Sequence, residues 1–360
     1  YWTDFINGHI PNFDLSAYEQ IDNYVKECWE AIVDTAVWAE KELPGVLEKV
    51  SPDIVCVDNV ILFPAIKRYA RENNKPWIRV ISCSENEIPD PQIPPHLSGC
   101  GENDSECFSA YQNHFNEVIQ PIHDRFNAFL ADCGEAAYPV GEFFEASPHM
   151  NLLLYPEPVK FNRSKPLDSR QFQYLEGCVR DEESFQVPEF KTHNEAPLLY
   201  VSFGSLGSGD TGLLMRLMDV ISTMPVRALF NVGDYESEYD AVPDNVQIAS
   251  WYPQPSVISQ SDAVIHHGGN NSFNECLYFG KPALIMPYVW DGHDNAKRVA
   301  ETGHGCHLHR THWNPKDLRA TIESMLMNEA MQVRLAATST HMHSEHGPAK
   351  AAAILDQLLQ

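Results

Sequence analysis

Residues 263–275 read AVIHHGGNNSFNE, a short apolar run that ends in two glycines and passes directly into a helical pattern. The run Ala263–His266 has the length and composition of a buried strand. Gly268 and Gly269 allow a ligand to approach the backbone closely. A helix N-terminus beside them presents unpaired N–H groups, which favour an anion. This stretch therefore predicts an α/β domain with a phosphate-binding turn at the end of a strand.

Two further strand ends flank this turn in the sequence. Upstream, a short strand leads into Trp251 and Gln254; downstream, the apolar run Ala283–Met286 leads into the polar residues 287–296. Because carboxyl ends of parallel strands meet at one edge of a sheet, these polar tips are expected to converge. A structural alternative exists for the turn itself, in which residues 270–272 merely cap the helix.

Strands and helices alternate on both sides of a polar stretch that contains few apolar residues. This alternation is typical of two doubly wound parallel sheets, and 360 residues suit two domains. The predicted strands are 53–58, 77–81, 150–155, 198–203, 226–232, 246–249, 263–266 and 283–286. The predicted helices include 18–50, a run that Pro44 and Gly45 interrupt near its end, and also 65–73, 108–133, 209–223 and 349–359. The predicted divisions are an N-terminal domain (1–180), a linker (181–196), a C-terminal domain (197–345) and a C-terminal helix (346–360).

The composition excludes some classes of partner. Lysine and arginine total 25 against 50 aspartates and glutamates, a formal charge of −25 that repels phosphate backbones and anionic lipid heads. No apolar run approaches the roughly 20 residues that span a bilayer. The nine cysteines are odd in number and contain no CxxC pair, so we expect free thiols and a cytoplasmic location.

The polar residues around the glycine turn resemble the signature region of the family 1, UDP-sugar-dependent glycosyltransferases. That signature has a tryptophan and a glutamine, then His-x-Gly-x-Asn-Ser-x-x-Glu, then a proline-led strand end with an acidic residue and Asn-Ala. The matching residues are Trp251, Gln254, His267, Gly269, Asn271, Ser272, Glu275, Pro287, Asp291 and Asn295. The resemblance implies the GT-B fold, with two Rossmann-like domains facing a cleft. One departure is Gly292, because plant members have a glutamine there that contacts the sugar.

The resemblance also implies roles in binding a nucleotide-sugar donor. Ser205, in the turn after the strand 198–203, is a further phosphate-side candidate. No metal or cofactor is expected, because a helix N-terminus with histidine and serine side chains can neutralise a departing diphosphate. The implied roles are stacking on the nucleobase (Trp251), contact with its edge (Gln254), pyrophosphate binding (His267, Asn271 and Ser272, beside Gly269), ribose binding (Glu275) and hydrogen bonds to the sugar (Asp291).

Catalysis in that family uses a histidine base in the first βα loop and an aspartate that orients it. Asp58, followed by Asn59, resembles the orienting aspartate; its structural alternative is a cap on the next helix. His9 is the one candidate base within the chain, because it is the sole histidine before Asp58 and residues 7–11 (NGHIP) resemble the family's Gly-His-x-x-Pro string, but no apolar strand precedes it. We therefore expect the base to lie upstream of this chain, with the first strands missing from it.

The resemblance implies an inverting enzyme that moves a hexose from a UDP-sugar, or a related NDP-sugar, to a hydroxyl of an apolar small molecule. The acceptor is expected near Asp58, residues 84–87 and the proline-rich loop 88–96, where proline prevents regular structure. Two alternatives remain open: a nucleotide-sugar-binding protein without catalysis, and another GT-B enzyme such as a sugar epimerase. The histidines near the C-terminus (His341, His343 and His346) are interpreted as a polar stretch rather than a metal site.

Overall fold

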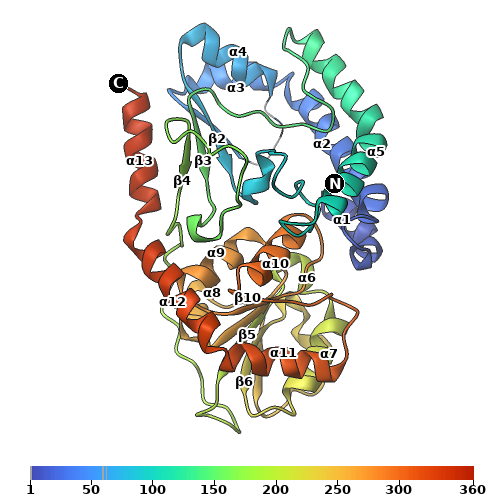
Figure 1. The fold of residues 1–360 in the computed structure, drawn as a ribbon, viewed down its shortest axis with the longest axis vertical. Helices are drawn as coiled ribbons and strands as arrows, with labels where there is room; N and C mark the ends of the chain where they lie inside the picture. The colour runs from blue at the N-terminus through green and yellow to red at the C-terminus, as the bar shows by residue number, and fades with distance from the viewer. Residues whose placement is uncertain (1, 59–60, 62) are drawn as a thin grey trace. The chain divides into compact units, whose positions relative to one another are not determined.

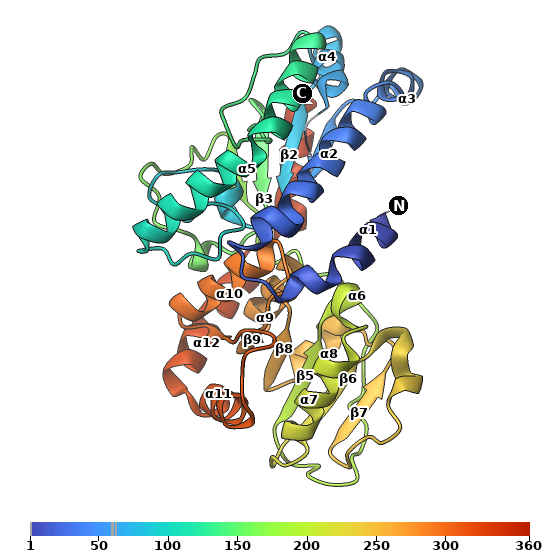
Figure 2. The ribbon, with the colours of Figure 1, turned by 90° about the vertical axis from the view of Figure 1, so that its right-hand side faces the viewer.

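The computed structural model describes residues 2–58, 61 and 63–360, and it divides the chain into two compact units (Figures 1 and 2). Unit 1 contains Tyr1–Tyr155, Lys160–Leu175 and Gly347–Gln360. Unit 2 contains Pro156–Val159 and Glu176–His346. Each unit is built on a parallel sheet, which confirms the predicted α/β class.

The sheet of unit 1 has four parallel strands in the order β1-β2-β3-β4. They are β1 (Val55–Asp58), β2 (Trp77–Ile81), β3 (Met150–Leu153) and β4 (Phe172–Tyr174). Neighbouring side chains on a strand point to opposite faces, so Trp77 and Ile78 belong to different layers of the core. Trp77 packs in a cluster with residues of α3 (Leu43–Val50) and α4 (Pro64–Asn73). Ile78 packs in a cluster with Ile354, Leu355 and Leu358 of α13 (Gly347–Leu358).

These contacts explain two differences from the predicted divisions. The C-terminal helix α13 belongs to unit 1, because its apolar side chains cover the sheet of that unit. The stretch 181–196 lies within unit 2, where the Phe185 N–H donates to Ser256 Oγ at 2.8 Å and the Gln247 side chain donates to the Glu189 carbonyl at 2.8 Å.

The stretch 18–50, predicted as one long helix, forms several shorter helices in unit 1. The chain turns at residues 40–42, and α3 begins at Leu43 because Pro44 is favourable in a first helical turn. Figures 1 and 2 show α2 and α5 side by side. The bounds are α1 (Trp2–His9), η1 (Ile10–Asp14), η2 (Ile21–Val25), α2 (Lys26–Ala39), η3 (Glu85–Glu87) and α5 (Ser105–Asp132).

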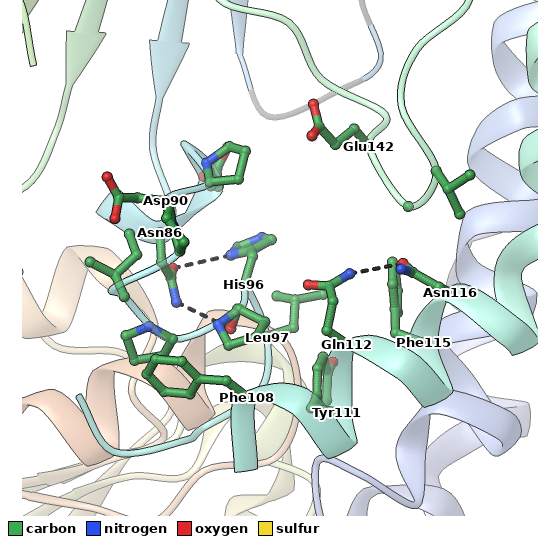
Figure 3. A pocket seen from close by; sticks show the side chains of 18 of the residues that line it. Asn86, Asp90, His96, Leu97, Phe108, Tyr111, Gln112, Phe115, Asn116 and Glu142 are labelled. Carbon is green, nitrogen blue, oxygen red and sulfur yellow. Dashed lines mark hydrogen bonds between the residues drawn. The ribbon is translucent and has the colours of Figure 1, made fainter. Parts of the chain in front are cut away.

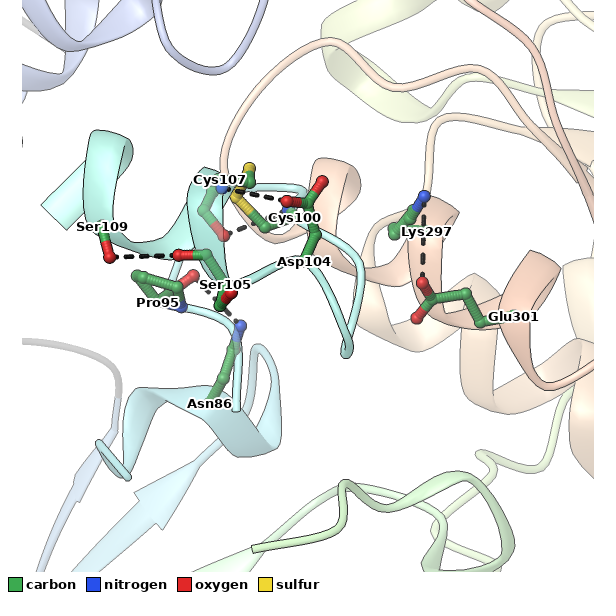
Figure 4. The surroundings of a disulfide bond; sticks show 10 residues. Asn86, Pro95, Cys100, Asp104, Ser105, Cys107, Ser109, Lys297 and Glu301 are labelled. Carbon is green, nitrogen blue, oxygen red and sulfur yellow. Dashed lines mark hydrogen bonds and ion pairs between the residues drawn. A yellow bond between two sulfur atoms is a disulfide. The ribbon is translucent and has the colours of Figure 1, made fainter. Parts of the chain in front are cut away.

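A disulfide joins Cys100 to Cys107, with the two Cα atoms 5.8 Å apart (Figure 4). The prediction that all nine cysteines are free thiols is therefore wrong. The bond closes a short turn that Asp104 also stabilises, by accepting the Cys107 N–H at 3.0 Å at the start of α5. Sequence spacing missed it because the two residues pair across an irregular loop rather than in a recognisable motif.

This disulfide predicts how many thiols an alkylating reagent will modify. Unfolded under non-reducing conditions, the chain is expected to take up iodoacetamide at its seven free cysteines, and at all nine after reduction. Intact-mass spectrometry measures the difference, and peptide mapping places it at Cys100 and Cys107. Nine labels without reductant would contradict the disulfide and favour the reducing, cytoplasmic location expected from the sequence.

The sheet of unit 2 has six parallel strands in the order β10-β9-β8-β5-β6-β7. They are β5 (Leu198–Ser202), β6 (Arg227–Asn231), β7 (Val246–Ala249), β8 (Ala263–His266), β9 (Ala283–Ile285) and β10 (Gly305–His307). The strand order reverses between β5 and β8, and open α/β sheets bind ligands at the carboxyl ends of strands at such a point.

Helices of unit 2 follow most of these strands along the chain. Among the helices that the structure describes in either unit, none is long and apolar enough to cross a membrane. The bounds are η4 (Glu157–Val159), α6 (Gly204–Gly207), α7 (Thr211–Ile221), η5 (Gly233–Glu238), α8 (Gln254–Gln260), α9 (Asn270–Tyr278), α10 (Asp291–Glu301), α11 (Pro315–Met327) and α12 (Glu329–Ser344).

Candidate functional site

The turns after β5 and β8 lie against each other at the point where the strand order reverses. Gly204 has a left-handed backbone (φ 66°), and a side chain added there would come within 3.1 Å of the His267 ring. Ser205 follows at the start of α6 and is exposed. The structure thus brings together the two predicted phosphate-side turns, one carrying Ser205 and the other His267.

The N-terminus of α9 begins at the glycine turn and has no side-chain cap of its own. Gly269 occupies the N-cap position, so the structural alternative in which residues 270–272 cap the helix is wrong. The Asn270 N–H donates instead to Asp291 Oδ2 at 3.1 Å. Asn271 is exposed in the first turn, as a ligand-binding amide would need to be.

Glu275 is the centre of a buried polar cluster. Its side chain accepts a hydrogen bond from Gln254 Nε2 at 2.6 Å, and the same Gln254 nitrogen donates to Ser272 Oγ at 3.1 Å. Arg180 Nη1 lies 3.9 Å from the other Glu275 carboxylate oxygen. Burial raises the pKa of Glu275, although Gln254 and Arg180 oppose that rise. Three predicted donor residues therefore meet, and sequence reasoning missed Arg180, whose only signal was its charge beside the acidic stretch.

Trp251 lies exposed just before this cluster. Its side chain is 56% exposed, which is unusual for a large aromatic residue. An exposed indole next to a buried polar cluster suits a surface on which a nucleobase stacks.

The backbone is strained at Trp290, directly before α10, whose first residue is Asp291. Trp290 has φ 58° and ψ −141°, a conformation that costs a non-glycine residue about 1–3 kcal/mol and is found mostly at functional sites. Asp291 Oδ2 also accepts from Asn295 Nδ2 at 3.3 Å. A side chain at Gly292 would come within 2.7 Å of the His267 carbonyl, so this backbone leaves no room for the glutamine of plant family members.

His266 ends β8 and His267 follows it directly, and both histidines are neutral at pH 7. Burial lowers the pKa of His266 to about 3 and that of His267 to about 4. His266 Nδ1 accepts the Gly268 N–H at 3.1 Å, which assigns the ring proton to Nε2. His267 lines the turn as a neutral ring, so it can offer a phosphate one N–H but no charge.

Replacing His266 by asparagine should reduce the loss of stability in acid. The folded state keeps His266 neutral while the unfolded state binds a proton below pH 6.5, so stability falls as pH drops from 6.5 towards 3. One such proton corresponds to about 1.4 kcal/mol per pH unit. Asparagine retains an acceptor for the Gly268 N–H but does not titrate.

We therefore expect the free energy of urea unfolding to decrease less steeply between pH 6 and pH 4 in His266→Asn, by up to about 1.4 kcal/mol per unit. Equal slopes in the parent and the variant would show that His266 does not remain neutral in the folded state.

The two candidate catalytic residues of unit 1, Asp58 and His9, differ in their exposure to solvent. Asp58 is exposed at the carboxyl end of β1. The next helix, α4, starts only at Pro64 with Phe63 at its N-cap and no side-chain cap, so Asp58 does not cap it. Asn59 lies outside the described residues.

His9 has contacts that give it a structural role. It ends α1, is 9% exposed, and places Nδ1 2.7 Å from the Phe5 carbonyl and Nε2 3.0 Å from Glu27 Oε2. Its ring also packs on that of Phe5, with centroids 4.3 Å apart. None of the contacts described for His9 reaches Asp58, so the structure does not assemble these two into a base–orienter pair.

Unit 1 contains a cavity of about 520 Å³, within the range of small-molecule sites (Figure 3). The irregular loop predicted at 88–96 forms one wall, where His96 Nδ1 donates to Asn86 Oδ1 at 3.3 Å. A face of α5 forms another, where Gln112 Nε2 donates to Asn116 Oδ1 at 2.8 Å. Sequence reasoning missed three contributions to the wall: Trp29 of α2, the α5 face and the segment 140–144.

The loop is held in place by buried ion pairs. Glu85 accepts the Phe161 N–H at 2.9 Å and the Tyr174 hydroxyl at 3.0 Å, and it pairs with Arg163 at 3.3 Å. Next to it, Glu87 pairs with Arg79 at 2.8 Å. Within the predicted acceptor segment 84–87, Asn86 and Glu87 therefore line the cavity, whereas Glu85 anchors the loop.

A second titratable cluster lies elsewhere in unit 2. Glu176 accepts the Glu157 N–H and a hydrogen bond from His341 Nε2, each at 2.6 Å. The ligand atoms of these three residues lie within 4.8 Å of one another, close enough to hold a metal ion. His341 was interpreted from sequence as part of a polar stretch, but it is the partner of a buried carboxylate. These hydrogen bonds account for the arrangement without an ion.

Comparison with known sequences finds relatives that are named as glycosyltransferases. Residues 217–358 match the family described as "Erythromycin biosynthesis protein CIII-like, C-terminal domain". The Bacillus subtilis (strain 168) protein named "Uncharacterized UDP-glucosyltransferase YdhE" is 25% identical over 245 residues, which are 64% of this chain and 61% of that protein. The chain thus spans less than two thirds of the length of the first curated relatives that it matches.

Solved structures show the same fold. The glycosyltransferase of kitacinnamycin superposes with a TM-score of 0.73 at 20% identity, covering 93% of this chain and 83% of that one. The spinosyn rhamnosyltransferase SpnG, complexed with thymidine diphosphate, superposes with a TM-score of 0.66 at 16% identity, covering 94% and 84%. The fold is therefore GT-B, with two Rossmann-like domains, as predicted. Within that fold class, the chain is related to the family 1 glycosyltransferases, which confirms the resemblance.

Proposed function

We propose that this protein is a glycosyltransferase that moves a sugar from a nucleoside diphosphate donor to a hydroxyl of an apolar small molecule. The observation that carries the proposal is the polar cluster of Gln254, Ser272 and Glu275 at the reversal point of the unit 2 sheet, beside the N-terminus of α9, whose N-cap residue is Gly269. The relatives that match this chain are themselves named as glycosyltransferases.

The donor would bind at the carboxyl ends of β5 and β8. The exposed Trp251 would stack on the nucleobase, and Glu275 would accept hydroxyl hydrogen bonds from the ribose in exchange for that from Gln254. The N–H groups of α9, with Ser272 and the neutral His267, would hold the diphosphate. Asp291, fixed by Asn270 and Asn295, would face the sugar.

The acceptor would bind in the cavity of unit 1, whose walls supply aromatic rings and a few amide side chains. In the proposed reaction an acceptor hydroxyl attacks the anomeric carbon, its proton passes to a base, and the diphosphate leaves with inversion at that carbon. Phosphate-side donors of unit 2 stabilise the leaving group, so we propose that neither a metal nor another cofactor takes part.

Calorimetric titration with UDP and dTDP, followed by product analysis, tests this function. We expect one nucleotide to bind and transfer to a phenolic or alicyclic alcohol to continue in EDTA, with an inverted anomeric configuration by NMR. Nucleotide binding without transfer would favour the sugar-binding alternative, and a donor that returns as its epimer would favour an epimerase. If neither nucleotide binds, the proposal fails.

A further inference from the structure

The cavity of unit 1 has a carboxylate that its own walls do not neutralise. Glu142 lines the cavity half-buried, and the structure shows no hydrogen bond or ion pair from its carboxylate to any residue that it describes. In Figure 3 dashed lines join Asn86 to His96 and Gln112 to Asn116, whereas none reaches Glu142. No lysine or arginine is among the lining residues.

The other two carboxylates on the wall already have partners. Glu87 is buried and paired with Arg79 at 2.8 Å. Asp90 accepts the Ser164 N–H at 3.0 Å and the Ser164 hydroxyl at 2.8 Å. Glu142 is therefore the wall carboxylate whose oxygens have no partner among the described residues and remain available to a ligand.

Hydrogen bonds and the close approach of α5 fix the backbone around Glu142, so the fold itself sets the position of this residue. Gly141 has φ 79°, and a side chain there would collide with Asn116 of α5, which lets the two segments approach closely. His123 Nε2 lies 3.0 Å from the Glu142 carbonyl, and the Glu142 N–H donates to the Pro139 carbonyl at 3.0 Å.

Aromatic rings line the same cavity. Trp29 stacks on Phe143 with centroids 4.2 Å apart and meets Phe144 edge-on at 5.4 Å. The faces of such rings attract cations, most strongly where water is excluded. One face of Phe144 already carries the Arg79 guanidinium, 4.5 Å from the ring centroid, so rings of this wall do accept a cation. Burial also raises the pKa of Glu142, so its carboxylate gains from a cation nearby.

We propose that this cavity selects a ring-containing acceptor that carries a protonated amine, with Glu142 as the counter-ion. The rings would bind the apolar body of the ligand, and Glu142 would pair with its ammonium group. An acceptor with a carboxylate would be repelled by Glu142 and by Asp90. This inference rests on the proposed function, which explains why an acceptor enters the cavity. It adds to that function the charge that the acceptor carries.

Equilibrium binding of three anthracenes of one shape tests this selection without a donor. The probes are 9-(aminomethyl)anthracene, 9-(hydroxymethyl)anthracene and 9-anthracenecarboxylate, titrated at pH 7 by fluorescence. We expect the ammonium probe to bind about tenfold more tightly than the alcohol, and the carboxylate most weakly. In Glu142→Gln the advantage of the ammonium probe should fall to within about twofold, while affinity for the alcohol stays unchanged.

Glu117→Gln is the matched control, because Glu117 is exposed on α5, does not line the cavity, and loses the same charge. It should keep the preference for the ammonium probe. Equal affinity for ammonium and alcohol in the parent protein, an unchanged preference in Glu142→Gln, or no binding of any probe would each overturn the inference. Failure here leaves UDP binding and sugar transfer to be judged by their own assays, so the two proposals fail independently.

Discussion

Glu275→Ala is expected to weaken UDP binding by about 10- to 150-fold, corresponding to about 1.5–3 kcal/mol for the loss of charged hydrogen bonds. Glu275 is 3% exposed and already accepts a hydrogen bond from Gln254 Nε2 at 2.6 Å, so its carboxylate is positioned before any ligand binds. A ribose diol would find two acceptor oxygens there at little cost in ordering. Alanine removes both oxygens and leaves Gln254 and Arg180 without their common partner.

Isothermal titration calorimetry with UDP measures this effect, and circular dichroism checks that the variant folds. Glu323→Ala is a suitable control, because Glu323 is a half-exposed glutamate on α11 that pairs with Arg319, away from the cluster. Its affinity for UDP should match that of the parent. If Glu275→Ala also binds UDP with parental affinity, Glu275 does not belong to the donor site.

The core strands were predictable because a strand buried on both faces is a continuous apolar run. The strands β2 and β8 coincide with their predicted ranges, and β5 differs by one residue. The edge strand β7 also coincides with its predicted range, although most of it is only half-buried. β4 was missed because it has only three residues, all half-buried, and no apolar run marks it. The helix predicted at 18–50 was interrupted because Pro44 and the turn before it outweigh the helical spacing of the flanking apolar residues.

The arrangement of the candidate donor-binding residues was more predictable than that of the cavity in unit 1 for a physical reason. His267, Ser272 and Glu275 lie within a single strand–turn–helix unit, so their spacing in the sequence fixes their spacing in space. The cavity of unit 1 is assembled from four segments that are distant in the sequence. Glu142 lines this cavity only because the fold brings the other three segments next to it. The disulfide and the contact of Arg180 with Glu275 likewise depend on folded positions rather than on a local pattern.

Asp58→Asn is expected to lower turnover by about 10²- to 10⁴-fold while leaving stability and UDP affinity nearly unchanged, if Asp58 orients the catalytic base. The structure removes the competing explanation that Asp58 caps α4, since that helix starts at Pro64 with Phe63 at its N-cap. Asp58 is also exposed, so no burial cost requires a partner for it. Its place at the carboxyl end of β1, where open α/β sheets bind ligands, is what supports a role in chemistry.

Asparagine keeps the shape of Asp58 and removes its charge, so a selective loss of turnover would report on that charge. An exposed substitution of this kind changes the free energy of unfolding by less than about 0.5 kcal/mol, which urea titration can verify. The matched control is Asp53→Asn, which removes an exposed carboxylate just before the other end of the same strand, where Asp53 pairs with Lys75. That variant should retain parental turnover. If the turnover of Asp58→Asn also stays within about twofold of the parent, the Asp58 carboxylate does not orient the base, and another aspartate must do so.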